Sequence, residues 1–208
     1  NVQYAVVNPL RLPAYRPEEE SVASAPDAEL KRTLDLLLNA QRPLIIGGQG
    51  LRQGNALSAF ENLLARIGIP VVFSRLGQDI LPFSHPLNFG QVGRRGVKYS
   101  KQILARPDLV IVLGSRLAVQ LAGSNLEHFA KEAAVVMVDV DRAELAQHGN
   151  RITVPVCGHV KPFIDGFLAR LEGLCLPDWS GWVDECRVLK AAQPMVLPEQ
   201  KRDPIDLY

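Results

Sequence analysis

The stretch LIIGGQGLRQGN, residues 44–55, decides how the rest of the chain is interpreted. A short apolar run leads into closely spaced glycines and then into a polar segment. A strand passes into a helix in this order in nucleotide-binding α/β domains. The glycines Gly47, Gly48, Gly50 and Gly54 come close to the dinucleotide pattern G-x-G-x-x-G without matching it. The loop therefore predicts either a phosphate site or a tight strand-to-helix turn, and the residue types alone leave both open.

Outward from this loop, apolar runs alternate with segments of helical periodicity. The runs are apolar along their whole length, which is typical of strands buried on both faces of a parallel sheet. Strands are expected at residues 43–48, 70–74, 108–115, 134–141 and 152–158. Helices are expected before Pro43, at 56–68 with Gly68 as the C-terminal glycine, at 97–106, as a short helix within 116–132, and at 159–173. Residues 75–96 are rich in Gly and Pro and are expected to be irregular. The alternation predicts an α/β fold, a doubly wound, mostly parallel Rossmann-like sheet of five to six strands with helices on both faces.

Composition argues against several classes of function. A net charge of +1 over 208 residues gives no reason to expect nucleic acid or a membrane surface as partner. The apolar runs are too short to span a bilayer. Cys157, Cys175 and Cys186 form no disulfide or zinc pattern and are expected to be free thiols of a cytoplasmic protein. The histidines show no metal-ligand spacing and no nucleophile elbow is present, so neither a metal ligand nor a catalytic residue is predicted.

Ligands of such sheets bind beyond the carboxyl ends of the strands, so the residues there form the candidate site. Glycines in residues 47–50 let a pyrophosphate approach the backbone, Arg75 or Arg116 can pair with phosphate, and Asp139 can hold ribose hydroxyls. Alternatively, the glycines only make tight turns and the aspartates only cap helices. The loop GQVGRRGVKYS, residues 90–100, predicts either anion binding or a charged domain interface.

The ordered set of motifs resembles a known family. The matching stretches are RPLIIGGQG, GIPVVFSRLGQDILPFSHPLNFGQVG, ARPDLVIVLGSRL, VVMVDVDRAEL and VPVCGHVKPFIDGFLARL, which together cover about residues 27–172. The most specific is HPLNFGQVG after the second strand, followed by VDVDRAE after the fourth. In this order they are similar to the central domain of thiamine-diphosphate-dependent enzymes of the acetolactate synthase, pyruvate oxidase and oxalyl-CoA decarboxylase type.

The resemblance implies a domain organisation. Residues 1–25 would be a linker from a missing N-terminal pyrimidine-binding domain, and residues 26–175 the central Rossmann-like domain. Residues 176–208, with a helical stripe beginning at Trp179, would lead to a missing C-terminal diphosphate-binding domain. A start at Asn1 rather than Met fits a piece of a longer protein.

The resemblance also implies an activity for the longer protein. It would bind thiamine diphosphate and Mg²⁺, form a homo-oligomer and catalyse carbon–carbon lyase or ligase chemistry on 2-oxo acids or acyl-CoA compounds. The family holds the metal through a Gly-Asp-Gly motif, which this sequence lacks. The chain alone is therefore not expected to bind thiamine diphosphate or to be catalytic.

Central domains of this family hold FAD in some members, ADP and CoA in others, and no ligand in the rest. Carried over residue by residue, the cofactor contacts fall on Gly47, Gly48, Gly50, Leu76, Gly77, Gly93, Gly114, Arg116, Asp139 and Asp141. Two positions depart from the FAD type. Its G-x-R-F-D-D-R is GSRLAVQ here (residues 114–120), and His159 stands where it has an Asp, which removes an acceptor-only group. FAD, ADP and a purely structural pocket all stay open.

Two other classes of protein contain a sheet of a related kind. A sirtuin-type deacetylase would need a Cys-x-x-Cys zinc pair, which the sequence lacks. An FAD-carrying domain like the electron-transfer flavoprotein α-subunit stands as the alternative, with a yellow protein and a redox partner subunit as its expected signs.

Overall fold

Six parallel strands form the sheet on which the molecule is built. The structure is a computed structural model and describes residues 6, 8, 26–123 and 126–193. The strands are β1 (Pro43–Gly47), β2 (Val71–Phe73), β3 (Asn88–Gln91), β4 (Leu109–Leu113), β5 (Ala134–Asp139) and β6 (Val154–Cys157). Their order is β3-β2-β1-β4-β5-β6, and every neighbouring pair is parallel. This arrangement confirms the predicted doubly wound fold, with the topological switch point between β1 and β4.

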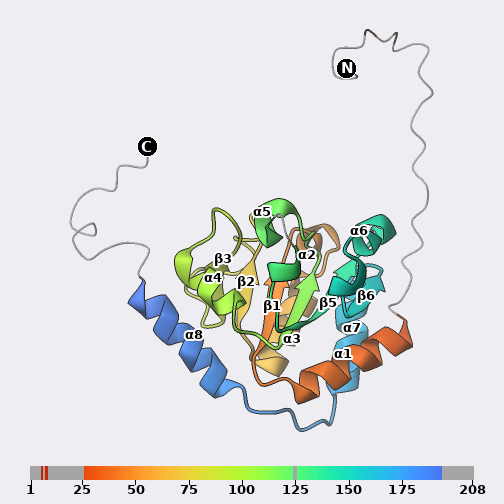
Figure 1. Ribbon diagram of the computed structural model, residues 1–208. Coiled ribbons are helices and arrows are strands. Elements are labelled where there is room, and N and C mark those ends of the chain that lie inside the picture. Colours follow the sequence, from red (N-terminus) through yellow and green to blue (C-terminus); the bar gives the residue numbers. More distant parts are fainter. Residues whose placement is uncertain (1–5, 7, 9–25, 124–125, 194–208) are drawn as a thin grey trace.

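Helices cover both faces of this sheet (Figure 1). One face is packed by α1 (Asp27–Asn39), α3 (Leu57–Ile67) and α7 (Val160–Leu171), and the other by α4 (Lys98–Leu104), α6 (Arg142–Gln147) and α8 (Ser180–Ala192). The connecting loops contain α2 (Gly50–Gln53), α5 (Val119–Ala122) and the 3-10 turns η3 (Leu126–His128) and η4 (Gly149–Arg151). Within β4, Ile111 packs against the first set of helices and Val112 against the second. Both faces are covered, which is why the strands are apolar along their length.

Helix α3 shows how local sequence sets an element's bounds. Phe60, Leu64 and Ile67 recur at helical spacing and are buried against the sheet. Gly68 ends the helix in the left-handed conformation, with φ of 63°, and its N–H donates to the Leu64 carbonyl at 2.9 Å. A glycine adopts this conformation without the steric cost of a Cβ, so the predicted C-terminal glycine is confirmed.

Helix α8 packs on the same sheet as the rest of the fold. The indole N–H of Trp179 donates to the Ala40 carbonyl at 2.9 Å, and that of Trp182 donates to the Pro43 carbonyl at 3.0 Å. Both indoles are buried, so each polar N–H is satisfied where water has no access. The two tryptophans thus attach the start of α8 to Ala40, shortly before β1, and to Pro43, the first residue of β1.

One segment differs from the expected elements. The region expected to be irregular contains β3, a four-residue edge strand whose polar residues and register shift against β2 hide the strand pattern. The short helix expected within 116–132 is confirmed as α5, and the turn η3 follows it. Apart from Val6 and Asn8, the predicted linkers at 1–25 and 194–208 lie outside the described residues. Of the helices in the described part of the chain, none has the length and apolar composition needed to cross a membrane.

Candidate functional site

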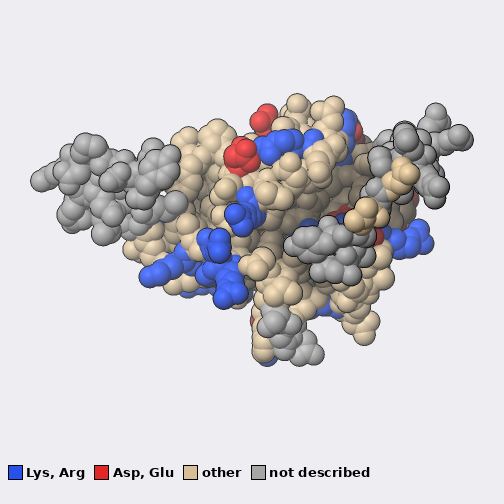
Figure 2. Space-filling view, turned by 90° about the horizontal axis from the view of Figure 1, so that it is seen from above, with Lys and Arg blue, Asp and Glu red and all other residues tan. Residues whose placement is uncertain are grey.

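A cavity of about 600 Å³ opens at the carboxyl edge of the sheet. This volume lies in the range of small-molecule and cofactor sites, and its position beyond the strand ends is the one expected for a doubly wound sheet. Figure 2 looks onto the end of the molecule where α2, α5 and α6 lie, and shows more Lys and Arg than Asp and Glu there. The polar and charged lining residues are Gln49, Gln53, Ser74, Arg75, Gln91, Arg95, Ser115, Arg116, Gln120, Asp139 and His159.

The structure brings half of the ten predicted cofactor-binding residues to this cavity. Those that line it are Gly50, Leu76, Gly114, Arg116 and Asp139. Those that do not line it are Gly47, Gly48, Gly77, Gly93 and Asp141. Gly47, Gly48, Gly77 and Asp141 lie within three residues of a lining member of the set, whereas Gly93 lines a neighbouring hollow.

The glycines outside the lining allow backbone segments to touch. A Cβ on Gly48 would collide with the Gly114 carbonyl oxygen and approach the Ser115 Cβ to 2.5 Å. A Cβ on Gly77 would lie 2.9 Å from the Gly47 carbonyl oxygen. Three loops from β1, β2 and β4 therefore meet backbone to backbone beneath the cavity, a use of glycine that needs no ligand.

The amides of the first loop already have partners. The N–H of Gly48 donates to the Leu113 carbonyl at 3.0 Å, and the N–H of Gly50 donates to the Gly114 carbonyl at 2.9 Å. The N–H of Leu51 donates to the Gly48 carbonyl at 3.1 Å. These amides hold the loops together and are not free to receive a phosphate in this structure.

An acidic wall lies beyond β5. The Asp141 carboxylate accepts the N–H groups of Ala143 and Glu144 and so caps α6. The guanidinium of Arg116 lies 3.2 Å from Asp141 and 3.8 Å from Glu144, and Glu144 also contacts His148 at 3.0 Å. Arg116 therefore has carboxylate partners within the protein, and the wall carries more negative than positive charge.

Among the described residues, Asp139 is the only one with a carboxylate that lines the cavity. Its side chain is mostly buried, and Oδ1 accepts the N–H of Asp141 at 2.9 Å. Burial raises the pKa of this carboxyl above its ordinary value, against the opposing effects of the Asp141 N–H and of Arg116. A buried carboxylate at the end of a strand is placed to accept hydrogen bonds from ligand hydroxyls.

Asp139→Asn is expected to raise the melting temperature at pH 7 by about 1–2 °C. A carboxyl whose pKa is raised on folding contributes stability below its unfolded pKa and loses it as the pH rises through the folded pKa. The advantage of the neutral amide should accordingly shrink as the pH is lowered from 7 to the acidic pH at which the wild-type carboxyl takes up its proton. Differential scanning calorimetry at both pH values checks this, and a larger gain at the lower pH would contradict it.

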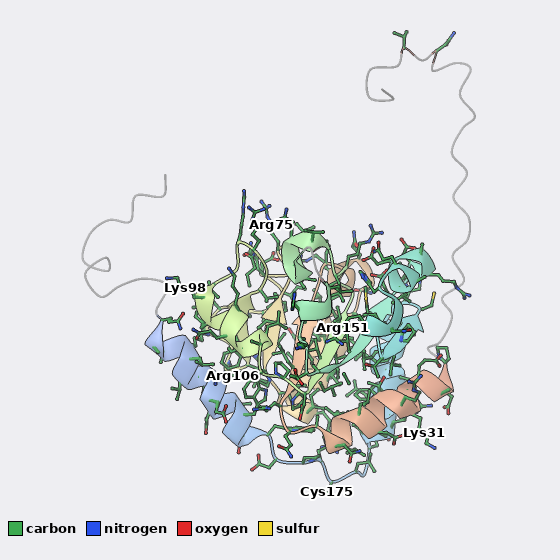
Figure 3. All side chains as sticks on the ribbon, in the orientation of Figure 1. Lys31, Arg75, Lys98, Arg106, Arg151 and Cys175 are labelled. Carbon is green, nitrogen blue, oxygen red and sulfur yellow. The ribbon has the colours of Figure 1, made fainter. Side chains whose placement is uncertain are left out.

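The opposite wall is basic. Arg75 follows β2 and Arg95 follows β3, both side chains are exposed, and both line the cavity. Within the described part of the chain, neither guanidinium has a hydrogen-bond or ion-pair partner. Figure 3 shows Arg75 at this edge, at the other end of the molecule from Cys175. The cavity lining thus has two unpaired guanidinium groups on one side, and on the other Asp139 and Arg116, whose guanidinium pairs with Asp141 and Glu144 outside the lining.

Sequence reasoning missed the glutamines of the cavity. Gln53, Gln91 and Gln120 line it from α2, β3 and α5. Neutral amides in short elements carry no periodic or motif signal, so no sequence pattern marked them. Arg95 lies in the basic loop for which anion binding was one of two predictions.

The described residues form no metal-binding cluster and no disulfide. No group of three or more His, Cys, Asp or Glu side chains gathers there in a way that could hold a metal ion. Cys157, Cys175 and Cys186 are free thiols. Burial raises the pKa of the Cys186 thiol to about 12, so it stays protonated and packs as an apolar group.

Comparison with known proteins agrees with this geometry. The family model described as "Thiamine pyrophosphate enzyme, central domain" matches residues 30–167. A probable acetolactate synthase large subunit of Methanocaldococcus jannaschii is 28% identical over 90% of this chain and 31% of its own length. A sulfoacetaldehyde acetyltransferase of Castellaniella defragrans is 38% identical over 68% of this chain and 24% of its own.

An acetolactate synthase of Mycobacterium leprae is 30% identical over 85% of this chain and 28% of its own length. The chain thus spans about a third or less of the length of these relatives. The family model covers well over half of the 208 residues, in the region that forms the sheet and its cavity. The chain belongs to the family of thiamine pyrophosphate enzyme central domains.

Proposed function

We propose that the chain is the non-catalytic middle part of a larger enzyme that uses thiamine diphosphate to make or break carbon–carbon bonds of 2-oxo acids or acyl-CoA compounds. The match to the central-domain family model over residues 30–167 carries this proposal. Relatives named acetolactate synthase and sulfoacetaldehyde acetyltransferase support the reaction class. The comparisons give no support to the alternative of an electron-transfer flavoprotein-like FAD carrier.

Thiamine diphosphate and its Mg²⁺ are assigned to other parts of the larger protein. The described residues offer no cluster of metal ligands, so they do not fit the metal. The partners of this chain are then its own N- and C-terminal domains and further copies of the whole protein. The chain's own contribution is to position those domains and to provide the cavity.

The cavity is proposed to bind an adenine nucleotide, either FAD or ADP. Its volume of about 600 Å³, the buried Asp139 on one wall and the unpaired Arg75 and Arg95 on the other support a ligand with hydroxyls at one end and phosphates at the other. Gly50 and Gly114 line the cavity where their own backbones pack against each other.

Calorimetric titration of the protein with ADP and FAD, read together with its absorbance spectrum, tests the nucleotide part. Saturable binding of either ligand with a one-to-one stoichiometry is expected, and the absence of binding heat with both ligands would contradict the nucleotide proposal.

The proposed enzyme activity is tested on the protein encoded by the complete reading frame. Turnover of pyruvate that depends on added thiamine diphosphate and Mg²⁺ is expected, and a purified full-length protein that binds no thiamine diphosphate would contradict the assignment.

A further inference from the structure

We propose that a small apolar hollow beside α5 is a docking site for a segment of the longer polypeptide that lies outside these 208 residues. The segment presents an apolar side chain next to Asp or Glu. This inference rests on the proposed function, in which the chain is the middle part of a larger enzyme. It concerns the surface beside the cavity and does not depend on whether the cavity holds a ligand.

The hollow measures about 260 Å³ and lies between the turn after β3, helix α4 and helix α5. Small-molecule sites usually measure about 300–1,000 Å³, so the hollow is small for a cofactor. It has the size and character of a pocket that receives an apolar anchor side chain of a protein partner. Its apolar lining side chains are Val92, Leu104, Val119, Leu121 and Ala122.

Backbone contacts fix the walls of the hollow. The Arg94 N–H donates to the Gln120 carbonyl at 2.7 Å, and a Cβ on Gly93 would lie 2.6 Å from the same oxygen. The Lys101 ammonium donates to the Arg94 carbonyl at 3.2 Å. The turn after β3, α4 and α5 are thus held together before any partner binds, which lowers the entropy that docking costs.

Helix α5 brings apolar side chains to the surface at the mouth of the hollow. None of its four residues is fully buried, and Val119 is 65% exposed. A single exposed valine is ordinary on a protein surface. Val119 differs because it continues the apolar lining of a hollow, so a partner that filled the hollow would cover it as well.

The charges at the hollow are all positive. Arg94 and Lys101 line it with exposed side chains, and neither forms an ion pair with any residue that the structure describes. Residues 80–107 and 109–126, which include the whole lining, contain no Asp or Glu. Figure 2 shows Lys and Arg gathered on the α4 side of this end of the molecule. Charge complementarity therefore assigns carboxylates to the occupant.

Most of the polypeptide that could supply such an occupant lies outside this chain. The matched regions are only 31%, 24% and 28% of three relatives, named above as acetolactate synthases and a sulfoacetaldehyde acetyltransferase. A middle part of a longer protein has to contact the parts on either side of it, and such contacts bury surface patches that the isolated part exposes. The hollow and Val119 are a patch of this kind.

Thiol labelling of a Val119→Cys variant measures whether the hollow is covered. The substitution is made in the 208-residue chain and in the protein encoded by the complete reading frame, and N-ethylmaleimide labelling at position 119 is followed by mass spectrometry. We expect labelling to be at least about 10-fold slower in the longer protein, because the docked segment has to open before the reagent enters.

Val188→Cys is the matched control for an open hollow. Val188 is 69% exposed and lies on α8, away from the lining of the hollow. In the 208-residue chain, positions 119 and 188 should be labelled at rates within about 3-fold of each other, because both are exposed there. Circular dichroism melts verify that the variants fold.

Charge reversal tests the chemistry of the occupant. In the longer protein with Val119→Cys, the further change Arg94→Glu should speed labelling at position 119 at least about 5-fold, because it places a carboxylate against those of the occupant. Arg187→Glu makes the same charge change on α8, outside the lining, and should alter the rate less than about 2-fold.

Each contrary result has a distinct meaning. Equal labelling at position 119 in the two proteins overturns the inference. Slow labelling already in the 208-residue chain overturns it too, since this chain or a second copy would then fill the hollow. Protection that Arg94→Glu leaves unchanged overturns the acidic occupant. Thiamine diphosphate binding by the same longer protein tests the proposed function separately, so binding together with an unprotected position 119 overturns the inference alone.

Discussion

Gly48→Ala is expected to destabilise the protein by about 3 kcal/mol or more, which lowers the melting temperature by about 6–12 °C. The added methyl group would collide with the Gly114 carbonyl oxygen and lie within 2.5 Å of the Ser115 Cβ. Both obstacles belong to the loop after β4, where the Gly50 amide bonds to Gly114, while the Gly48 amide bonds to Leu113 at the end of β4. The methyl group therefore cannot be accommodated by a side-chain rotation, and thermal and urea unfolding will measure the loss.

Gly181→Ala is the control for this substitution. A Cβ at Gly181 would meet nothing within 4 Å, and this residue lies in the first turn of α8. Alanine should leave stability unchanged or raise it by up to about 1 kcal/mol, because it has the higher helix propensity. If Gly48→Ala behaved like Gly181→Ala, the three loops could not be packed backbone to backbone as described.

Trp182→Ala is expected to cost about 3–5 kcal/mol. The side chain is 4% exposed, packs with Val183 and Cys186 against one face of the sheet, and donates its indole N–H to the Pro43 carbonyl. Trp182→Phe keeps most of the buried area and loses the hydrogen bond, so it should cost about 1–2 kcal/mol. The difference between the two variants separates packing from hydrogen bonding.

The same variant tests the predicted domain boundary near residue 175. If α8 is part of the cooperative fold, Trp182→Ala lowers the melting temperature of the whole protein and speeds amide exchange in β1 as well as in α8. An unchanged melting temperature, with faster exchange confined to Ser180–Ala192, would show that the helix is an appendage. The observed hydrogen bonds of Trp179 to Ala40, shortly before β1, and of Trp182 to Pro43, at the start of β1, favour the first outcome.

Much of the fold follows from local sequence. Uniformly apolar runs marked strands that are covered on both sides, and Gly68 marked the end of α3 because its conformation favours glycine. The edge strand β3 was not predicted, because Asn88 and Gln91 break the apolar pattern where only one neighbour strand exists. The tail stripe predicted α8, but no local pattern says which face of the sheet a helix covers.

The candidate site was predicted in position but not in detail. Parallel strands end at one edge, so residues after different strands were expected to meet there, and Gly50, Arg116 and Asp139 do meet at the cavity. Whether a glycine faces a ligand or a neighbouring loop depends on contacts far apart in sequence, such as Gly48 with Gly114. The pairing of Arg116 with Glu144 is likewise a long-range property that residue types cannot reveal.

Backbone-on-backbone contact beneath the cavity also has a consequence for how its ligand preference can evolve. Three loops meet there without intervening side chains, so single substitutions at Gly48, Gly50 or Gly77 disrupt the fold before they alter recognition. Arg75 and Arg95, at the exposed edge of the cavity, differ from these glycines because their side chains contact no partner in the described structure. Substitutions that change the ligand preference are therefore expected at the exposed residues Arg75 and Arg95. The three glycine loops beneath the cavity stay the same whichever ligand binds.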